Sequence, residues 1–574
     1  MRSKSLFFAI LSSLYVTSHA TNFDVCLESV KNGTFGTGKI GATDSYGNIL
    51  EDVAQATGVT YDLCVKACGS GQEPFRWPQF SQQFSSWLLP WLALVSQLPF
   101  GPKDRLENLE SVVLTVGSPM LAAYSLSLTV LYGRWITRHF SKYKYPNIQN
   151  AIRVLRSLQQ VPLRVTNEGA LLASLIVLPQ NDAWWRELIE WLAFPHTWSI
   201  SAVTSIAWVV IAYIFTITHS FTGDLASDFN FNPDGKGVGS LWLWLLPIVI
   251  GWLQISPKCD EDRVRSAVDR ANKIAYEATN STHGVFVTEE RAIYLASGEE
   301  DEVLRCDEMV TAPIYNYARF LPWVQVVEKV SKTFGVESVS QVVAHSPHTA
   351  STSRWGSNVV SRIAIASALA FMLQWGTVGA AFIVVYYTPT TGEQDSFTFL
   401  LLFNTEGLIH RPTGLGCRSA SYLLFGALST IVWLLLLISS LLVHYVATSS
   451  PSSACTQIEP PTAPRYHGGH SYPLRLSIAR HFAIFLRRLA KLLATVNALW
   501  ILAACLFQFG NFFDRCYCNS SVFGRGRGAY NVIKLVASNV EPMKNAWIGG
   551  VCLAGGTAFL FVGFVNVFIK PTTS

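Results

Sequence analysis

The sequence predicts an all-α membrane protein with about seven transmembrane helices, and two observations lead to that prediction. Long apolar stretches recur along the chain, each about 19 residues or longer, which is close to the length that a helix needs to cross a bilayer. Charged residues make up only 14% of the 574 residues, against about 25% in soluble domains, and few of them interrupt these stretches. The predicted spans are residues 109–132, 198–221, 238–256, 363–387, 420–447, 489–510 and 546–569.

Two shorter apolar segments leave the count open between seven and nine. Residues 87–100 are interrupted by Pro90 and Pro99, and residues 169–179 form a shorter stretch still. Segments of this length are more typical of interfacial or re-entrant helices than of spans. We therefore predict seven spans, with nine as the alternative.

The first 20 residues have the three parts of a cleaved signal peptide. Arg2 and Lys4 precede a short apolar core at 6–16, and Ser-His-Ala at 18–20 is a small-residue cleavage site. The alternative is a short membrane anchor. Cleavage after Ala20 would place the next residues in the lumen or outside the cell.

Positive charge predicts the orientation, because Lys and Arg near span ends favour the cytoplasmic side. Residues 133–166 contain seven Lys or Arg and no acid, and residues 448–488 contain five Arg and one acid, Glu459. The loop between the second and third spans is acidic instead. Seven spans with the N-terminus outside and the C-terminus cytoplasmic satisfy all three loops.

This topology divides the chain into five parts and predicts a multi-pass protein of the secretory pathway, in the plasma membrane. The parts are a signal peptide (1–20), an outer Cys-containing region (21–83), a membrane region with three spans and a basic cytoplasmic loop (84–256), a cytoplasmic helical domain (257–362) and a membrane region with four spans (363–574).

The same topology predicts on which side of the membrane the cysteines and the glycosylation sequons lie. An even set of cysteines falls outside, where disulfides form, and six cysteines allow 15 pairings between which sequence cannot choose. Sequons at Asn32 and Asn519 are outside and usable, whereas the one at Asn280 is cytoplasmic. The disulfide candidates are Cys26, Cys64, Cys68, Cys417, Cys516 and Cys518.

A basic amphipathic helix is predicted to lead into the sixth span. Apolar residues recur at helical spacing from Leu474 to Leu492, and most basic residues lie off that stripe. Such a helix is expected to bind the anionic head groups of the cytoplasmic leaflet. Ordinary positive-inside anchoring is the alternative. The basic residues expected to face lipid are Arg475, Arg480, Arg487, Arg488 and Lys491.

Chemical signatures are scarce. The polar residues inside the predicted spans that attract interest are Gln374, Asn497 and Asn566, and none is charged. Ion-coupled transporters usually carry an acid or base near the midplane, so a neutral solute is the more natural cargo of any transporter here. No common nucleotide-binding, zinc-protease or hydrolase motif is present. We therefore expect no enzyme activity, no cofactor, no metal and no nucleic-acid partner.

Several motifs resemble a family of predicted fungal multi-pass membrane proteins that have no established activity. They are WLWLLP at 242–247, SPKCD at 256–260, TAPIYNYARFLPW at 311–323 and QWGT at 374–377. The resemblance covers most of the chain from about residue 74. It implies a fungal source and a similar topology, and it supplies no catalytic or binding residues.

The chain departs from that family at one place. Family members run from a TPTTG segment, here 388–392, directly into LGCRS, here 415–419. Residues 393–414 separate the two, and the insert ends in a near-repeat, PTG at 412–414. A retained intron in the gene and a genuine outer-loop insertion both explain it.

Two functional hypotheses follow. The first is a non-enzymatic, sensor- or scaffold-like membrane protein with a disulfide-bonded outer face and a cytoplasmic protein partner bound through 257–362. The alternative is a transporter or channel for a neutral or lipid-like solute. The heptahelical layout resembles that of receptors, but fold alone specifies no ligand.

Overall fold

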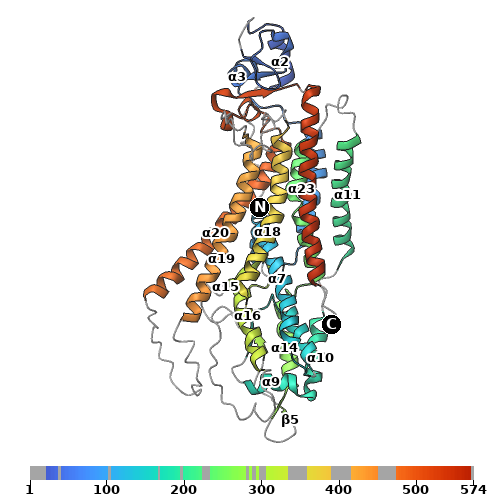
Figure 1. The fold of residues 1–574 in the computed structure, drawn as a ribbon, viewed down its shortest axis with the longest axis vertical. Helices are drawn as coiled ribbons and strands as arrows, with labels where there is room; N and C mark the ends of the chain where they lie inside the picture. The colour runs from blue at the N-terminus through green and yellow to red at the C-terminus, as the bar shows by residue number, and fades with distance from the viewer. Residues whose placement is uncertain are drawn as a thin grey trace, which may run out of the picture.

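The structure, a computed structural model, is elongated and mostly helical, with three parts along its long axis (Figure 1). A small cap that contains α2 and α3 lies at one end, a helix bundle forms the middle, and a base that contains α9, α10 and α14 lies at the other end. The residues described are 21–569 except 37–40, 101–104, 146, 166–168, 194–197, 223–232, 279–283, 287–292, 296–305, 334–357, 389–414, 450–473 and 535. The predicted signal peptide, the sequon at Asn280 and the insert at 393–414 lie outside them.

Among the described residues, five helical segments are long and apolar enough to cross a membrane, or six if α6 (Arg105–Gly117) and α7 (Pro119–Phe140) together form one bent span, against the seven spans predicted. Four of them are within single helices: α18 (Val359–Tyr386), α19 (Cys417–Ser449), α20 (Leu474–Phe509) and α23 (Ala537–Ile569). The fifth, Gly237–Ile255, combines α12 (Pro233–Trp242) with α13 (Leu245–Ile255). The apolar part of α11 (Ile200–Thr222) is shorter, covering Ile200–Phe215. The protein is therefore a helical membrane protein, and the count of seven remains a prediction.

The predicted span at 109–132 is broken in two. Helix α6 (Arg105–Gly117) and helix α7 (Pro119–Phe140) meet at an angle of 101°. Pro119 has no N–H to continue the helix, and it forces the residue before it away from helical geometry. Ser118 is accordingly non-helical and caps α7 by accepting a hydrogen bond from the backbone N–H of Leu121. The segment predicted as one span is therefore bent sharply at Pro119.

The two doubtful segments differ in their placement. Most of residues 87–100 lies in a π-helical turn, η2 (Phe84–Leu88), and in α5 (Leu89–Val95), which pack against α11, α12 and α13 inside the bundle. Residues 169–179 form α9 (Gly169–Val177), which packs against strand β4 in the base (Figure 1). The second segment is thus part of the base, and the nine-span alternative stays a prediction.

The cap combines the N-terminal region with the segment that follows α20. Strand β2 lies between β1 and β7 in an antiparallel sheet, in which Val59 pairs with Ala42 and with Asn531. Phe23, Leu27 and Leu63 form its small apolar core. Its elements are α2 (Phe23–Lys31), β1 (Ala42–Thr43), η1 (Val53–Gln55), β2 (Gly58–Thr60), α3 (Tyr61–Cys68), α21 (Cys516–Asn519), α22 (Val522–Arg525), η8 (Gly526–Gly528) and β7 (Tyr530–Val532).

The base is built from two separate loops, so residues of the predicted cytoplasmic helical domain at 257–362 pack with residues of the basic loop and of the segment after it. Strand β3 from the first loop pairs with β6 from the second, and α10 packs on α14. The Asn181 side chain forms two hydrogen bonds with the backbone of Tyr276. Its Nδ2 donates to the carbonyl oxygen at 2.9 Å, and its Oδ1 accepts from the N–H at 2.8 Å. The first loop supplies α8 (Ile148–Ser157), β3 (Leu163–Val165), α9, η3 (Pro179–Asn181) and α10 (Asp182–Leu192). The second supplies α14 (Glu261–Asn272), β4 (Tyr276–Ala278), β5 (Gly284–Phe286), β6 (Ile293–Leu295), α15 (Cys306–Met309), η4 (Pro313–Tyr315) and α16 (Asn316–Thr333).

Helix α4 (Trp77–Gln83) joins the cap to the bundle.

The described segments that were predicted to lie outside and those predicted to be cytoplasmic are at opposite ends of the molecule. The cap holds four bonded cysteines, Cys64, Cys417, Cys516 and Cys518, whereas the base holds the basic loop. Arg156 of that loop donates to the carbonyl oxygen of Ile569 at the end of α23, at 2.8 Å. Segments predicted to share a side of the membrane therefore lie at the same end, and which end faces the cytoplasm stays a prediction.

The close crossing of α6 and α20 depends on Gly117. A Cβ atom there would lie 2.0 Å from the backbone carbonyl oxygen of Ala494. We predict that Gly117→Ala lowers the stability of the purified protein by about 1–3 kcal/mol, because the helices must separate. The control is Gly556→Ala in α23, where nothing lies within 4 Å. Thermal unfolding in lipid nanodiscs measures both, and equal melting temperatures for the two variants would contradict the tight crossing.

Candidate functional site

Buried charges join the base to the bundle at one place. Asp307 of α15 is buried between two basic residues of α20, Arg487 and Lys491. Glu110 of α6 lies at the half-exposed edge and contacts Lys491. We call these four residues, with Tyr315 and Tyr317, the ion cluster.

Asp307 accepts two hydrogen bonds and forms an ion pair with Arg487, and these contacts compensate the loss of water around its carboxylate. Its Oδ1 is 2.6 Å from the Lys491 Nζ, and its Oδ2 is 2.6 Å from the Tyr317 hydroxyl. The Arg487 Nε lies 3.4 Å from Oδ2. The side chains of Asp307 and Arg487 are only 3% and 6% exposed, so neither is neutralised by solvent and each depends on the other.

Glu110 completes the charge balance from the opposite side of Lys491. Its Oε1 is 2.6 Å from the Lys491 Nζ and accepts a hydrogen bond from the Tyr315 hydroxyl at 3.0 Å. The cluster thus has two acids and two bases, with no net charge. Lys491 bridges a carboxylate of the bundle and a carboxylate of the base, and so links α6, α15 and α20.

Local structure explains why Tyr315 and Tyr317 reach the cluster. Pro313 begins the short 3₁₀ helix η4, which precedes α16 and packs against α6 and α7. Ser125 of α7 donates to the carbonyl oxygen of Ile314, and Ser440 of α19 donates to that of Tyr317. The base therefore inserts a polar segment into the bundle, where α7 and α19 hold it.

Arg319 stabilises the same segment through hydrogen bonds within the base. Its side chain is buried, and its guanidinium donates to the carbonyl oxygens of Gln160, Val310 and Ala312 and to the Oδ1 of Asn316. Gln160 belongs to the first loop of the base, whereas Val310 and Ala312 belong to the second. One guanidinium therefore holds both loops together beneath the ion cluster.

The ion cluster corrects the prediction that five basic residues face lipid. Arg487 and Lys491 point into the protein, whereas Arg475 and Arg488 are exposed and Arg480 is half-buried. The outward face of α20 is instead its apolar stripe, in which Leu474, Ile478, Phe482, Phe485 and Leu492 are exposed.

Sequence reasoning also missed the two acids. Glu110 lies inside the predicted span at 109–132 and was overlooked, and Asp307 comes from a loop that was not expected to enter the bundle. The available signal was the pair Arg487 and Lys491 at helical spacing within a mostly apolar stretch. A buried base of this kind requires an acidic partner.

A second polar group surrounds the break between α6 and α7. Asn497 of α20 donates to the carbonyl oxygens of Gly117 and Phe425, at 2.8 and 3.0 Å. Ser429 of α19 accepts from the backbone N–H of Met120 at 3.2 Å, and the side chain of Gln374 bonds Ser429. Side chains of α19 and α20 thus satisfy backbone groups at the break, as broken helices in membranes require, and Gln374 of α18 bonds Ser429.

The polar residues singled out in the spans therefore have mostly structural contacts. Gln374 and Asn497 are buried at the break, and Asn566 of α23 is exposed and donates to the carbonyl oxygen of Val562. A small cavity near the break, between Ser125 and Trp252, has a volume of about 20 Å³, which is room for about one water molecule.

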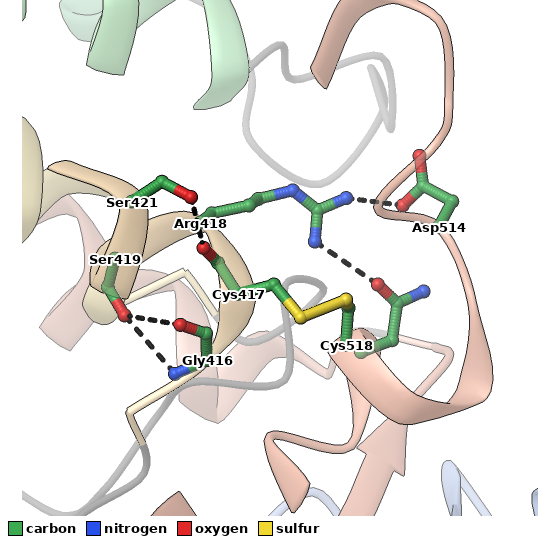
Figure 2. Close-up of a disulfide and its surroundings, with 8 residues drawn as sticks. Gly416, Cys417, Arg418, Ser419, Ser421, Asp514 and Cys518 are labelled. Carbon is green, nitrogen blue, oxygen red and sulfur yellow. Dashed lines mark hydrogen bonds and ion pairs between the residues drawn. A yellow bond between two sulfur atoms is a disulfide. The ribbon is translucent and has the colours of Figure 1, made fainter. Parts of the chain in front are cut away.

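The cap contains two disulfides among the six candidate cysteines. Cys64 bonds Cys516 and Cys417 bonds Cys518, whereas Cys26 and Cys68 remain free thiols. Figure 2 shows the second disulfide beside Arg418, which reaches from the first turn of α19 toward Asp514. Their ion pair measures 2.5 Å. The first turn of α19 is therefore joined to the segment that follows α20 by a covalent bond and an ion pair.

The two sequons differ in accessibility. Asn32 is exposed at the end of α2. Asn519 is buried, and its Oδ1 accepts a hydrogen bond from Arg418 at 3.1 Å. A glycan at Asn519 has little room in this fold, because the amide that would carry it belongs to a residue that is only 5% exposed; this argues against the earlier expectation for that sequon.

Comparisons with protein-family models, with curated proteins and with solved structures found no match to this chain. The resemblance to fungal membrane proteins therefore stays a prediction.

Arg487 and Arg488 are adjacent, but only Arg487 belongs to the ion cluster, so their substitution should affect stability differently. We predict that Arg487→Gln lowers stability by about 3 kcal/mol, because it leaves Asp307 with one less buried charge partner. The neighbouring change Arg488→Gln, at an exposed position, should stay within about 0.5 kcal/mol. Thermal unfolding of both variants in nanodiscs measures the difference, and similar losses would show that Arg487 is not buried in an ion pair.

Proposed function

We propose that this protein is a non-enzymatic, sensor- or scaffold-like membrane protein in which the cap is mechanically coupled to the base. One observation carries the proposal: the ion cluster joins the base to α20, whose opposite end continues into the cap. A change in the cap has a direct structural route to the base through a single helix.

The pair α19 and α20 suits this role. The helices have 33 and 36 residues, or about 50 Å at about 1.5 Å per residue. Cys417–Cys518 joins their ends at the cap, and Ser439 donates to the carbonyl oxygen of Ala483 near their other ends, at 2.8 Å. A pair of long helices connected at both ends transmits displacement better than separate helices would.

The predicted orientation adds the expected partners. With the cap outside, the base is cytoplasmic and presents the surface through which a protein partner binds. The three basic residues of α20 outside the ion cluster, Arg475, Arg480 and Arg488, then lie at the inner leaflet, where anionic head groups attract them. This orientation accords with a secretory-pathway protein of the plasma membrane.

A transporter or channel for a neutral or lipid-like solute is the second candidate, and the broken helix favours it. Transporters often bind substrate at discontinuous helices, and here Gln374, Ser429 and Asn497 gather at the break. Solute uptake into proteoliposomes that is lost in Asn497→Ala would support this candidate over the first.

The coupling proposal predicts that damage to the cap reaches the base. The double variant Cys417→Ser, Cys518→Ser removes the bond between the helix ends. Backbone hydrogen exchange in 306–333 should then accelerate several-fold, because the helices shift more freely around the ion cluster. Cys552→Ser, which removes an exposed thiol of α23, is the control. Faster exchange confined to the cap would refute the coupling.

The orientation predicts where glycans attach. Asn32→Gln should abolish a mobility shift on deglycosylation, because Asn32 is exposed on the cap. Asn280→Gln should leave the shift unchanged. A glycan on Asn280 instead would reverse the proposed orientation.

A further inference from the structure

Four cysteines meet in the cap. Cys64 and Cys516 are joined by a disulfide, and the sulfur atoms of Cys64, Cys68 and Cys516 all lie within 4.8 Å of one another. The thiol of Cys26 donates to the carbonyl oxygen of Ala67 on α3, and Cys26 and Cys68 are close enough to interact electrostatically. A disulfide and a dithiol are therefore in contact.

The local fold produces this meeting. Cys64 and Cys68 are four residues apart on α3, so their side chains share one face of the helix. Helix α2 packs on α3 and brings Cys26, and α21 packs on α3 from another side and brings Cys516.

We propose that these four cysteines form an internal thiol–disulfide exchange site, in which the disulfide moves between Cys64–Cys516 and Cys26–Cys68. The proximity of the Cys68 sulfur to both bonded sulfurs carries the proposal. The exchange does not depend on the proposed coupling function, although it would loosen the cap that this function uses.

The exchange balances without an external oxidant or reductant. The Cys68 thiolate attacks the sulfur of Cys516, forming Cys68–Cys516 and releasing the Cys64 thiolate. The Cys26 thiolate then attacks Cys68, forming Cys26–Cys68 and releasing the Cys516 thiolate. Two protons leave Cys68 and Cys26, and two protons return to Cys64 and Cys516. The two electrons lost by the first dithiol reduce the original disulfide.

Burial makes the resting pairing persistent. Desolvation raises the pKa of Cys68 and that of Cys26 above the ordinary value for a thiol. Since only the thiolate attacks, exchange is slow at neutral pH and accelerates as pH rises toward those values. The rate should increase about tenfold per pH unit while the thiols remain mostly protonated.

The two pairings have different structural consequences. Cys64 and Cys516 are 452 residues apart, and their bond ties the N-terminal part of the cap to the segment after α20. A Cys26–Cys68 bond would lie within the N-terminal part alone. After exchange the two parts remain joined only by non-covalent contacts, including the pairing of β2 with β7.

Disulfide mapping of the full-length protein tests the exchange. The protein is purified without reductant, incubated at pH 7 or pH 9, quenched with acid, alkylated and analysed by mass spectrometry. We expect Cys26–Cys68 peptides to form about 100-fold faster at pH 9 than at pH 7, since the thiolate fraction rises by that factor. Cys417–Cys518 is the internal control and should stay unchanged.

Two variants identify the steps. Cys68→Ser should retain Cys64–Cys516 at both pH values, because the attacking thiol is absent. Cys26→Ala should stop at the mixed disulfide Cys68–Cys516, and it tests the first step even if Cys68→Ser folds poorly. Two results would overturn the proposal. The first is wild-type protein in which Cys64–Cys516 and Cys26–Cys68 are both formed, so that no free thiol is left among the four cysteines. The second is wild-type protein that contains neither Cys26–Cys68 nor the mixed disulfide Cys68–Cys516 after incubation at pH 9.

Discussion

The ion pair between Asp307 and Arg487 is the constraint on which much of the structure depends. Both side chains are almost fully buried, and a buried charge that loses its partner is strongly destabilising. Arg487 and Lys491 must therefore face inward, which turns the apolar stripe of α20 outward. Asp307 has to reach them from the base, and so α15 and η4 enter the bundle. The position of the base beneath the helices follows from this requirement.

The break between α6 and α7 is part of the same arrangement. Helix α6 carries Glu110 at the ion cluster and ends at Gly117, close to Asn497 of α20. Helix α7 then departs at a steep angle and contacts η4 through Ser125. Both halves of the bent segment therefore contact η4, α6 through Glu110 and Tyr315 and α7 through Ser125. Polar side chains from α19 and α20 bond backbone groups at the break, as membranes require.

Local sequence properties predicted the features that depend on local energetics. A run of about 20 apolar residues is stable across a bilayer on its own account, so α18, α19 and α23 lie close to where they were expected. The separation of basic loops from cysteine-containing segments likewise predicted which segments share an end. Disulfide partners, the inward turn of Arg487 and the joining of two loops in the base depend on contacts between distant residues. No local pattern reports those contacts, although Pro119 did indicate a local disturbance in its helix.

A double-mutant cycle between Asp307 and Lys491 tests the central claim most directly. The variants are Asp307→Asn, Lys491→Met and the combination, and the free energy of unfolding of each is measured in nanodiscs. If the two residues pair directly across the boundary between base and bundle, as the 2.6 Å contact indicates, the effects should be non-additive by about 1–3 kcal/mol, with the double variant less damaged than the sum. Effects that add to within about 0.5 kcal/mol would show that the pair does not hold the base to α20.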